Sequence, residues 1–542
     1  MDQTSDRRLR IAFIHPDLGI GGAERLIVDA AVGLQRRGHE VEIFTSYHDP
    51  KHCFEPTRDG TLLVHHMKTL FPRSIAGSFH SICAIIQQLS LVLQLLFSLL
   101  IFQSPGTFPR WTYSLLSSCP PVASFDVVFM DQQAFGVPWI KLLGGTRVVF
   151  YCHFPDKDIS NSIAKQRAIA RGQSGPSAIR KLYRLPLDLI EEATMDYSDK
   201  ICVNSEFTQK HFVKSFFRLR RNPRVLYPGI DTSTYDADKV TAVLRKFKGE
   251  IGESSAVQKA VEEVVTASDR PTLISINRFE AKKNVGLALQ AFAGAQKELA
   301  GQGVDISSHR LVIAGGYDRR VQDNIATLSE LQKQATQLGL SHTTLFFTTQ
   351  PGQKDPDLAG LKSVSVIFLP SLPGALLNTL LLNPSVQALL YTPTDEHFGI
   401  VPLEAMACGL PVLATNTGGP MESIVDAVWD STSSSFTNLE TGTGLLRHPS
   451  ATVWTGALVC LLSAPATDRA KMGETAKSRV KERFSLEAMT SALEKVLTEA
   501  EAKGTVRGDE GFYQMASFVG ALVVMMSAWI YMRYKYGPSL RG

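Results

Sequence analysis

The 542-residue chain is predicted to be an α/β protein with two parallel-sheet domains. In both halves, short apolar segments alternate with amphipathic ones, and several of the short segments are apolar without a break. Strands buried on both faces of a parallel sheet show this pattern, with helices covering the two faces. Two such blocks of about 200 residues each predict two Rossmann-like domains that face a cleft. The 44% hydrophobic content is sufficient for two cores and excludes a disordered protein.

The expected elements can be placed in order along the chain. In the first block, strands are expected at Arg10–His15, Val41–Thr45, Asp126–Met130, Thr146–Cys152, Lys200–Val203 and Arg224–Tyr227, with a helix at Gly22–Arg37. In the second, strands are expected at Thr272–Ile276, Arg310–Ala314, Ala388–Tyr391 and Val412–Ala414, with helices at Lys283–Leu299 and near Leu403–Cys408. These elements place the N-terminal domain at residues 1–228 and the C-terminal domain at residues 229–505.

Two long apolar segments predict contact with a membrane. Residues 515–532 carry no charge and, as a helix of about 27 Å, are long enough to span a bilayer or to lie in its plane. A buried C-terminal helix is the alternative. Residues 82–102 are equally long but contain three glutamines, which favours a helix lying in the membrane interface. A spanning hairpin and a core helix remain alternatives for this second segment.

Charge and cysteine content exclude other classes of protein. The net charge of +4 comes from 56 basic and 52 acidic residues without a basic stripe, so a nucleic-acid partner is not expected. The seven cysteines are scattered and include no CxxC pair, which argues against a disulfide framework or a zinc site. No signal-peptide pattern opens the chain, so we expect the domains to face the cytosol.

A glycine-rich turn follows the first strand. Gly19, Gly21 and Gly22 precede Glu24 at the start of the first expected helix. Glycines let a ligand approach the backbone, and a helix N-terminus favours an anion such as a diphosphate. The spacing is not GxGxxG, and no acid follows the second strand to hold a ribose, which disfavours NAD. A tight turn without a ligand is the alternative.

Three candidate site residues follow strands. Arg278 and Lys283 come after strand Thr272–Ile276, where side chains point into the ligand crevice of a parallel sheet. Two cations there could neutralise a departing nucleoside diphosphate without a metal, whereas solvated surface charge is the alternative. His153 ends strand Thr146–Cys152, and both a structural and a functional role stay open for it.

The most specific segment runs from Glu396 to Glu404. Pro402 fits the first position of a helix, which would put Glu404 at the third position and Glu396 in the preceding loop. Two carboxylates eight residues apart can then contact two parts of one ligand; the alternative is that Glu404 only satisfies first-turn amides. Two loose DxD matches, at residues 156–158 and 236–238, follow no convincing nucleotide-binding strand, so no metal site is expected.

Together, the GGAE turn, the Arg278/Lys283 pair and the E-x7-E segment resemble retaining GT-B glycosyltransferases of family 4. Longer segments are more specific: HPDLGIGGAER (15–25), FYCHFP (150–155), SINR (275–278), AGGYD (314–318) and YTPTDEHFGIVPLE (391–404). They resemble the α-1,3/1,6-mannosyltransferases of dolichol-linked oligosaccharide assembly, over roughly residues 8–490. The resemblance implies a GT-B fold with an N-terminal acceptor domain and a C-terminal donor domain.

The resemblance also implies the reaction. Mannose would pass from GDP-mannose to Man-GlcNAc2-diphosphodolichol, first in α-1,3 and then in α-1,6 linkage, with retention, for N-glycosylation. The enzyme would sit at the endoplasmic reticulum membrane with its catalytic domains in the cytosol, without a cofactor and with no metal strictly required. Other mannosyltransferases of lipid-linked oligosaccharides are candidate partners. The alternatives are a GT-B transferase for another lipid acceptor, such as a phosphoinositide or sterol, and a non-catalytic GT-B-like membrane scaffold.

Roles carry over residue by residue from the resemblance. Arg278 and Lys283 would grip the donor diphosphate, and Glu404 would hold the ribose hydroxyls. Glu396 would contact the mannose, and His153 would lie near the reacting carbon. The remaining donor-binding residues implied are Gly21, Gly22, Phe398, Gly399, Ile400 and Val401.

The chain departs from the family pattern in one place. About 40 residues separate Thr344–Phe347 from Ala388–Tyr391, which is more than the family usually has there. The apolar run Val364–Leu382 within them is interpreted as a membrane-contacting insertion or an artefact of gene prediction.

Overall fold

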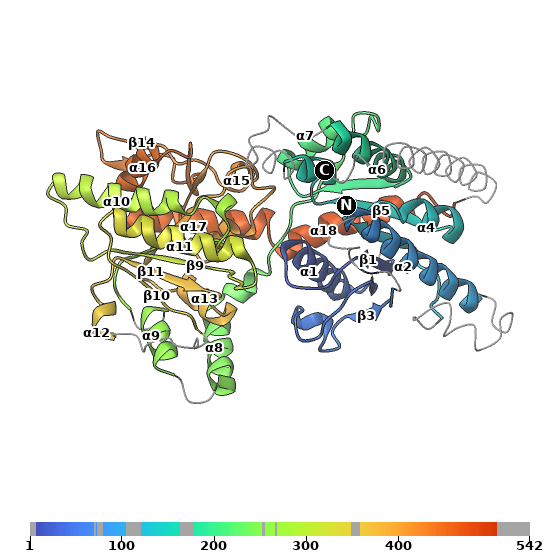
Figure 1. Cartoon of the computed structure of the whole chain (residues 1–542), viewed down its shortest axis with the longest axis horizontal. Helices are drawn as coiled ribbons and strands as arrows, with labels where there is room; N and C mark the ends of the chain where they lie inside the picture. Colours follow the sequence, from blue (N-terminus) through green and yellow to red (C-terminus); the bar gives the residue numbers. More distant parts are fainter. Residues whose placement is uncertain are drawn as a thin grey trace. The chain divides into compact units, whose positions relative to one another are not determined.

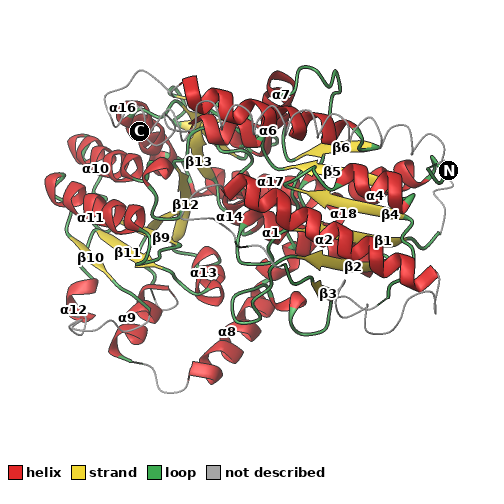
Figure 2. Ribbon diagram, turned by 45° about the vertical axis from the view of Figure 1, so that its right-hand side comes forward, coloured by secondary structure: helices red, strands yellow, loops and turns green. Residues whose placement is uncertain are grey.

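The computed structural model divides into two units with parallel sheets. It describes residues 7–69, 72, 80–103, 121–162, 178–251, 255–265, 268–347 and 358–506. Unit 1 comprises Met1–Gly229 and Met489–Gly542, and unit 2 comprises Ile230–Ala488. Figure 1 labels the elements, and Figure 2 shows the strands of each sheet side by side with helices over them. The predicted apolar segment 515–532 lies outside the described residues.

The sheet of unit 1 has seven parallel strands in the order β3-β2-β1-β4-β5-β6-β7. Its central strands are buried along almost their whole length, as expected for a sheet covered on both faces. The strands are β1 (Arg10–His15), β2 (Glu40–Thr45), β3 (Leu63–His66), β4 (Val127–Asp131), β5 (Arg147–Cys152), β6 (Lys200–Val203) and β7 (Arg224–Val225). The helices are α1 (Gly22–Arg36), α2 (His80–Gln103), α4 (Val137–Gly144), α6 (Ala178–Asp196) and α7 (Glu206–Ser215), with the 3-10 turn η1 (Glu55–Thr57).

The last helix that the structure describes, α18 (Leu486–Glu501), belongs to unit 1 from Met489 onward. Its apolar row includes Leu493, Val496 and Leu497, which are fully buried. On its other side, Glu494 pairs with Arg37 at 2.6 Å and Glu499 pairs with Lys200 at 2.6 Å. Our placement of every residue up to 505 in the C-terminal domain is therefore wrong from Met489 onward. An amphipathic helix can cover either domain, and its sequence pattern does not say which.

The sheet of unit 2 also has seven parallel strands, in the order β10-β11-β9-β8-β12-β13-β16. They are β8 (Thr272–Ile276), β9 (Arg310–Gly315), β10 (His342–Thr344), β11 (Val366–Pro370), β12 (Val386–Tyr391), β13 (Val412–Thr415) and β16 (Gly444–Arg447). β14 (Trp429–Asp430) and β15 (Ser435–Phe436) form a small antiparallel pair. The α-helices are α8 (Ala237–Ile251), α9 (Ala256–Val265), α10 (Gly286–Gly301), α11 (Gln322–Gln337), α12 (Leu358–Leu361), α13 (Gly374–Leu381), α14 (Ile400–Ala407), α15 (Pro420–Ser423), α16 (Ala451–Ser463) and α17 (Ala466–Arg483), with the 3-10 turns η2 (Thr232–Tyr235) and η3 (Ala281–Lys283). The expectation of two Rossmann-like parallel sheets is confirmed.

The apolar run Val364–Leu382 belongs to the core of unit 2. β11 is inserted between β10 and β9, and all five of its residues are buried. Pro370 ends the strand, Pro373 precedes α13, and this helix packs on α8 and α9. The interpretation as a membrane-contacting insertion is therefore wrong, because the apolar side chains fill the unit's own interior.

Helix α2 is apolar on two sides. Among the described residues, Cys83–Gln103 is the one helix long and apolar enough to cross a membrane. One side of α2, which includes Leu91, Val92 and Leu95, packs into the core of unit 1. Its other side exposes Leu93 and Leu100. A helix that is bound to its own domain along one side and apolar along the other has the pattern of one that lies on a surface rather than one surrounded by lipid.

Candidate active site

The Glu24 side chain covers the glycine-rich turn at the start of α1. Gly21 is the N-cap, and a Cβ atom at this position would collide with the Glu24 carboxylate, which folds back over the first turn. Among the described residues, nothing lies within 4 Å of a Cβ built at Gly22. A side chain at Gly21 would therefore displace the end of the flexible Glu24 side chain, whereas the backbone at Gly22 is open to a ligand. Both lie where an anion would meet the N-terminus of α1.

A buried network joins the ends of three neighbouring strands in unit 1. His15 ends β1, Asp131 ends β4, and His153 directly follows β5. Asp131 Oδ1 lies 2.7 Å from His15 Nδ1, and Asp131 Oδ2 lies 2.7 Å from His153 Nε2. Because an ionised carboxylate only accepts hydrogen bonds, each of these ring nitrogens carries a proton. Asp131 thereby fixes the orientation of the His153 ring.

The network holds charges inside the protein. Burial by itself disfavours a charged His15, but the Asp131 carboxylate outweighs it and raises the pKa of His15 to about 9. Burial likewise opposes ionisation of Asp131, yet the charge and hydrogen bond of His15, together with His153, keep its pKa below the usual value. Glu24 Oε1 lies 3.9 Å from His15 Nε2 and adds a second negative neighbour. At neutral pH the network therefore contains a protonated His15 and an ionised Asp131.

In unit 2, the loop after β8 presents the predicted cations. Lys283 Nζ lies 2.5 Å from Glu396 Oε2, so the structure brings these two predicted residues into contact. The carbonyl oxygen of Lys283 also accepts a hydrogen bond from Thr392 Oγ1 at 2.7 Å. Arg278 is largely exposed and pairs with Glu280 at 3.2 Å. Lys283 is thus held by the loop that carries Glu396, and Arg278 is held within its own loop.

A pair of glycines fixes the loop that bears Glu396. Gly418 has φ 72°, and a Cβ there would collide with the backbone of Glu396. A Cβ at Gly419 would collide with the backbone of Phe398, and Gly419 N donates to Glu396 O at 2.8 Å. The two glycines therefore let one loop lie directly on the other. The Phe398 side chain is buried, so only its backbone can face a ligand.

Helix α14 starts earlier than predicted. Gly399 is its N-cap with φ 92°, and a Cβ there would lie 3.1 Å from the Tyr391 hydroxyl. Ile400 and Val401 are the first two helical residues, so Pro402 stands at the third position and Glu404 at the fifth. Our placement of Glu404 in the third position is wrong. Proline is accepted at the third position because the first four N–H groups of a helix lack partners within it.

Glu404 is oriented by a tyrosine that the sequence analysis missed. The hydroxyl of Tyr235, at the end of η2, donates to Glu404 Oε1 at 2.9 Å. Tyr235 is 4% exposed, so its ring is fixed by packing. His15 and Asp131 were missed as well, although both end apolar strands in the same way as His153. A polar residue at the carboxyl end of a strand is the signal that could have found them.

Comparisons with known proteins give the family. A family model described as "Glycosyltransferase Family 4" matches residues 20–234, and one described as "Glycosyl transferases group 1" matches residues 257–479. The α-1,3/1,6-mannosyltransferase ALG2 of Rhizomucor pusillus is 38% identical over 520 residues, which cover 96% of this chain and 98% of the relative. The chain belongs to the ALG2 mannosyltransferase family. ALG2 of Saccharomyces cerevisiae is 37% identical over 484 residues, which cover 89% of this chain and 83% of that one.

Solved structures agree on the fold of this ALG2-family chain. Anabaena Alr3699/HepE in complex with UDP and glucose superposes with a TM-score of 0.54 at 15% identity and covers 91% of this chain and 100% of its own. Sucrose-phosphate synthase from Thermosynechococcus elongatus superposes with a TM-score of 0.58 at 16% identity, and the match covers 92% of this chain and 100% of the synthase chain. At such identities the likeness shows the fold alone. The predicted GT-B fold and the assignment as a glycosyltransferase are confirmed.

Proposed function

We propose that this ALG2-family enzyme transfers mannose from GDP-mannose to Man-GlcNAc2-diphosphodolichol, first in α-1,3 and then in α-1,6 linkage. The observation that carries the proposal is the 38% identity to an α-1,3/1,6-mannosyltransferase over 96% of the chain. The contact between Lys283 and Glu396 and the hydrogen bond between Tyr235 and Glu404 support it, because these carboxylates and this cation are held in defined positions.

The donor would be bound mainly by unit 2. Glu404, oriented by Tyr235, accepts hydrogen bonds from the ribose hydroxyls. Lys283 and Arg278 bind the diphosphate, for which Lys283 exchanges its carboxylate partner. Glu396, released from Lys283, then accepts hydrogen bonds from the mannose. The backbone of Phe398, Gly399, Ile400 and Val401 lines the donor at the N-terminus of α14, and Gly21 and Gly22 approach its diphosphate.

The reaction would be a same-face substitution with retention. The bond from the mannose anomeric carbon to the diphosphate oxygen breaks, and the acceptor oxygen bonds to that carbon from the same side. The acceptor proton passes to the leaving diphosphate, so charge and atoms balance. Lys283 and Arg278 stabilise the negative charge that develops on the leaving group, and His153 lies beside the reacting carbon. The reaction would need no cofactor and would not strictly require a metal, because Lys283 and Arg278 supply the positive charge.

The enzyme would work at the cytosolic side of the endoplasmic reticulum membrane, where its acceptor is embedded. The exposed apolar side of α2 would rest in the interface, and residues 515–532 would add a second anchor. A dual attachment of this kind brings the active site to a lipid-linked substrate. Other mannosyltransferases that build lipid-linked oligosaccharides would be neighbours on the same surface.

The test is a product-sizing assay with the full chain in detergent. Labelled GDP-mannose and the diphospholipid acceptor should yield products larger by one and then two hexoses. If the label appears only in another lipid, the proposed identity of the acceptor is wrong. If no mannose is transferred at all, the alternative of a non-catalytic scaffold is favoured. Glu404→Ala should abolish the transfer, whereas Glu474→Ala, at an exposed position on α17, should not change it.

A further inference from the structure

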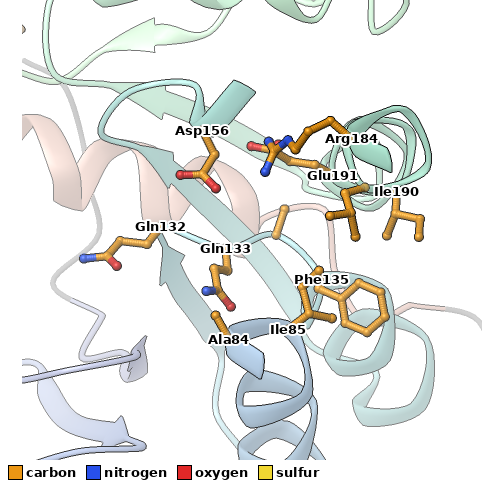
Figure 3. A pocket seen from close by; sticks show the side chains of 11 residues that line it. Ala84, Ile85, Gln132, Gln133, Phe135, Asp156, Arg184, Ile190 and Glu191 are labelled. Atoms are coloured by element: carbon orange, nitrogen blue, oxygen red, sulfur yellow. The ribbon is translucent and has the colours of Figure 1, made fainter. Parts of the chain in front are cut away.

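Unit 1 contains a cavity that none of the residues assigned to the donor lines. Its volume is about 260 Å³, and eleven residues line it. They come from the first turns of α2, the loop after β4, the helical segment that begins at Asp156 and one side of α6 (Figure 3). We refer to it as the α2–α6 cavity. Two of its lining residues are close in sequence to the buried network: Gln132 follows Asp131 directly, and Asp156 lies three residues after His153.

The loop after β4 is fixed and presents polar groups to the cavity. The Gln88 side chain on α2 donates to the Gln133 carbonyl at 2.5 Å and accepts from Gly136 N at 3.1 Å. Gln132 has φ 59°, a strained conformation for a residue other than glycine. The side-chain oxygen of Gln133 is buried and has no hydrogen-bond partner among the residues that the structure describes. A buried, unpaired acceptor costs about 1–3 kcal/mol, which a ligand hydroxyl would recover.

The charges in the cavity nearly cancel. Arg184 pairs with Asp188 one turn along α6 at 2.9 Å. Burial, and next the Asp156 carboxylate, raise the pKa of Glu191 to about 8, so at neutral pH this carboxyl group is mostly protonated. It can then both donate and accept a hydrogen bond. Asp156 is a second carboxylate in the lining, and its negative charge would repel a phosphate. The cavity therefore suits neutral hydroxyl groups better than a phosphate.

The rest of the lining is apolar and continues along α2. Phe135 and Ile190 line the cavity, as does Ile85 on α2 (Figure 3). Apolar walls with a few directed polar groups are usual for small-molecule sites. From Ile85, apolar residues recur at helical spacing on one side of α2, at positions 89, 93, 97 and 100. Leu93 and Leu100 are each 46% exposed, and the row is roughly 22 Å long.

We propose that the α2–α6 cavity binds the sugar end of the lipid-linked acceptor, whose lipid chain follows the apolar row on α2. Gln133, Asp156 and Glu191 hydrogen-bond the sugar hydroxyls, and Phe135 contacts a carbon face of the sugar ring. The inference rests on the proposed function, because it locates that reaction's acceptor. A ligand with hydroxyl groups at one end and a long hydrocarbon at the other matches both the cavity and the row.

The test separates acceptor binding from donor binding in the full-length enzyme. Ala84→Trp should fill the cavity, and Gln133→Leu and Glu191→Ala should each remove one hydrogen-bonding group. We expect the KM for the lipid-linked acceptor to rise about tenfold or more in each variant, since tenfold corresponds to about 1.4 kcal/mol, while the KM for GDP-mannose stays within twofold. Glu192→Gln is the matched control on α6, because Glu192 accepts from Arg218 N instead of lining the cavity.

A further pair of variants tests the row on α2. Leu93→Gln with Leu100→Gln should raise the KM for the lipid-linked acceptor but leave that for soluble Man-GlcNAc2 unchanged. An unchanged acceptor KM in Ala84→Trp, Gln133→Leu and Glu191→Ala would overturn the inference while the proposed function stands. If the wild type transfers no mannose, the proposed function fails. Calorimetric binding of soluble Man-GlcNAc2 to wild type but not to Ala84→Trp would then still support the cavity, and equal binding to both would overturn it.

Discussion

Replacing Asp131 with Asn tests the buried histidine network through its dependence on pH. The variant keeps the size of the side chain but removes the charge that holds the proton on His15. The pKa of His15 is about 9 in the folded protein against 6.5 in the unfolded chain. A shift of this size corresponds to roughly 3 kcal/mol of folding free energy. Because the pKa is raised, this stabilisation is fully present below pH 6.5 and is lost as the pH rises through 9.

We therefore expect Asp131→Asn to lower the stability of unit 1 by about 3 kcal/mol at pH 6. By pH 10, where His15 is neutral, only the loss of the hydrogen bonds that the two imidazoles donate to the Asp131 carboxylate should remain, so the penalty should be clearly smaller. The stability of unit 1 alone can be measured by hydrogen exchange in peptides from β1 and β4, after correction for the intrinsic exchange rates. Asp126→Asn is the control, because Asp126 accepts from Arg10 N at the other end of β1 and contacts no buried histidine. A penalty for Asp131→Asn that is equal at pH 6 and pH 10 would refute the reasoning.

Three further predictions concern unit 2. Lys283→Met should lower kcat about 100-fold, because it removes the positive charge that stabilises the leaving diphosphate, and Lys283→Arg should keep partial activity. A kcat near wild type in Lys283→Met would contradict this role. Tyr235→Phe removes the hydrogen bond from the Tyr235 hydroxyl to Glu404, so the KM for GDP-mannose should rise about tenfold with little change in kcat. An unchanged KM would exclude the positioning role. Gly419→Ala should lower the stability of unit 2 by about 1–3 kcal/mol in urea unfolding, because its Cβ would collide with Phe398. Gly456→Ala in α16 should be neutral or slightly stabilising, because a Cβ there meets nothing within 4 Å in the part of the chain that the structure describes.

The strands were predictable because they are buried on both faces. β1, β5, β8 and β9 start within one residue of their expected positions, since a run of apolar residues between turn signals has few other interpretations. β11 and α13 were misread for the same reason. An apolar run gives the same signal whether it is buried in a protein core or in lipid. Only the position of β11 between β10 and β9 shows that this run belongs to the core.

The candidate site was predictable where neighbours in sequence carry it. Glu396 and Glu404 lie on one loop and the helix that follows, so their spacing predicts a shared role, and this role stays a prediction. The contact between His15 and Asp131 spans 116 residues and depends on β1 lying next to β4. The register pairs Ile14 with Met130, which places the next residue of each strand side by side. Strand order is a property of the whole sheet, and no local pattern encodes it.

The position of α18 has a consequence for how the protein is made. Unit 1 is complete only when residues from Met489 onward are present, and about 260 residues of unit 2 are synthesised in between. At about 5–20 residues per second, the ribosome needs roughly tens of seconds for that stretch. During this interval the nascent N-terminal domain lacks α18, whose Leu493, Val496 and Leu497 are fully buried in the finished protein. A chaperone that shields this surface during translation would therefore act on the first domain while the second is still being made.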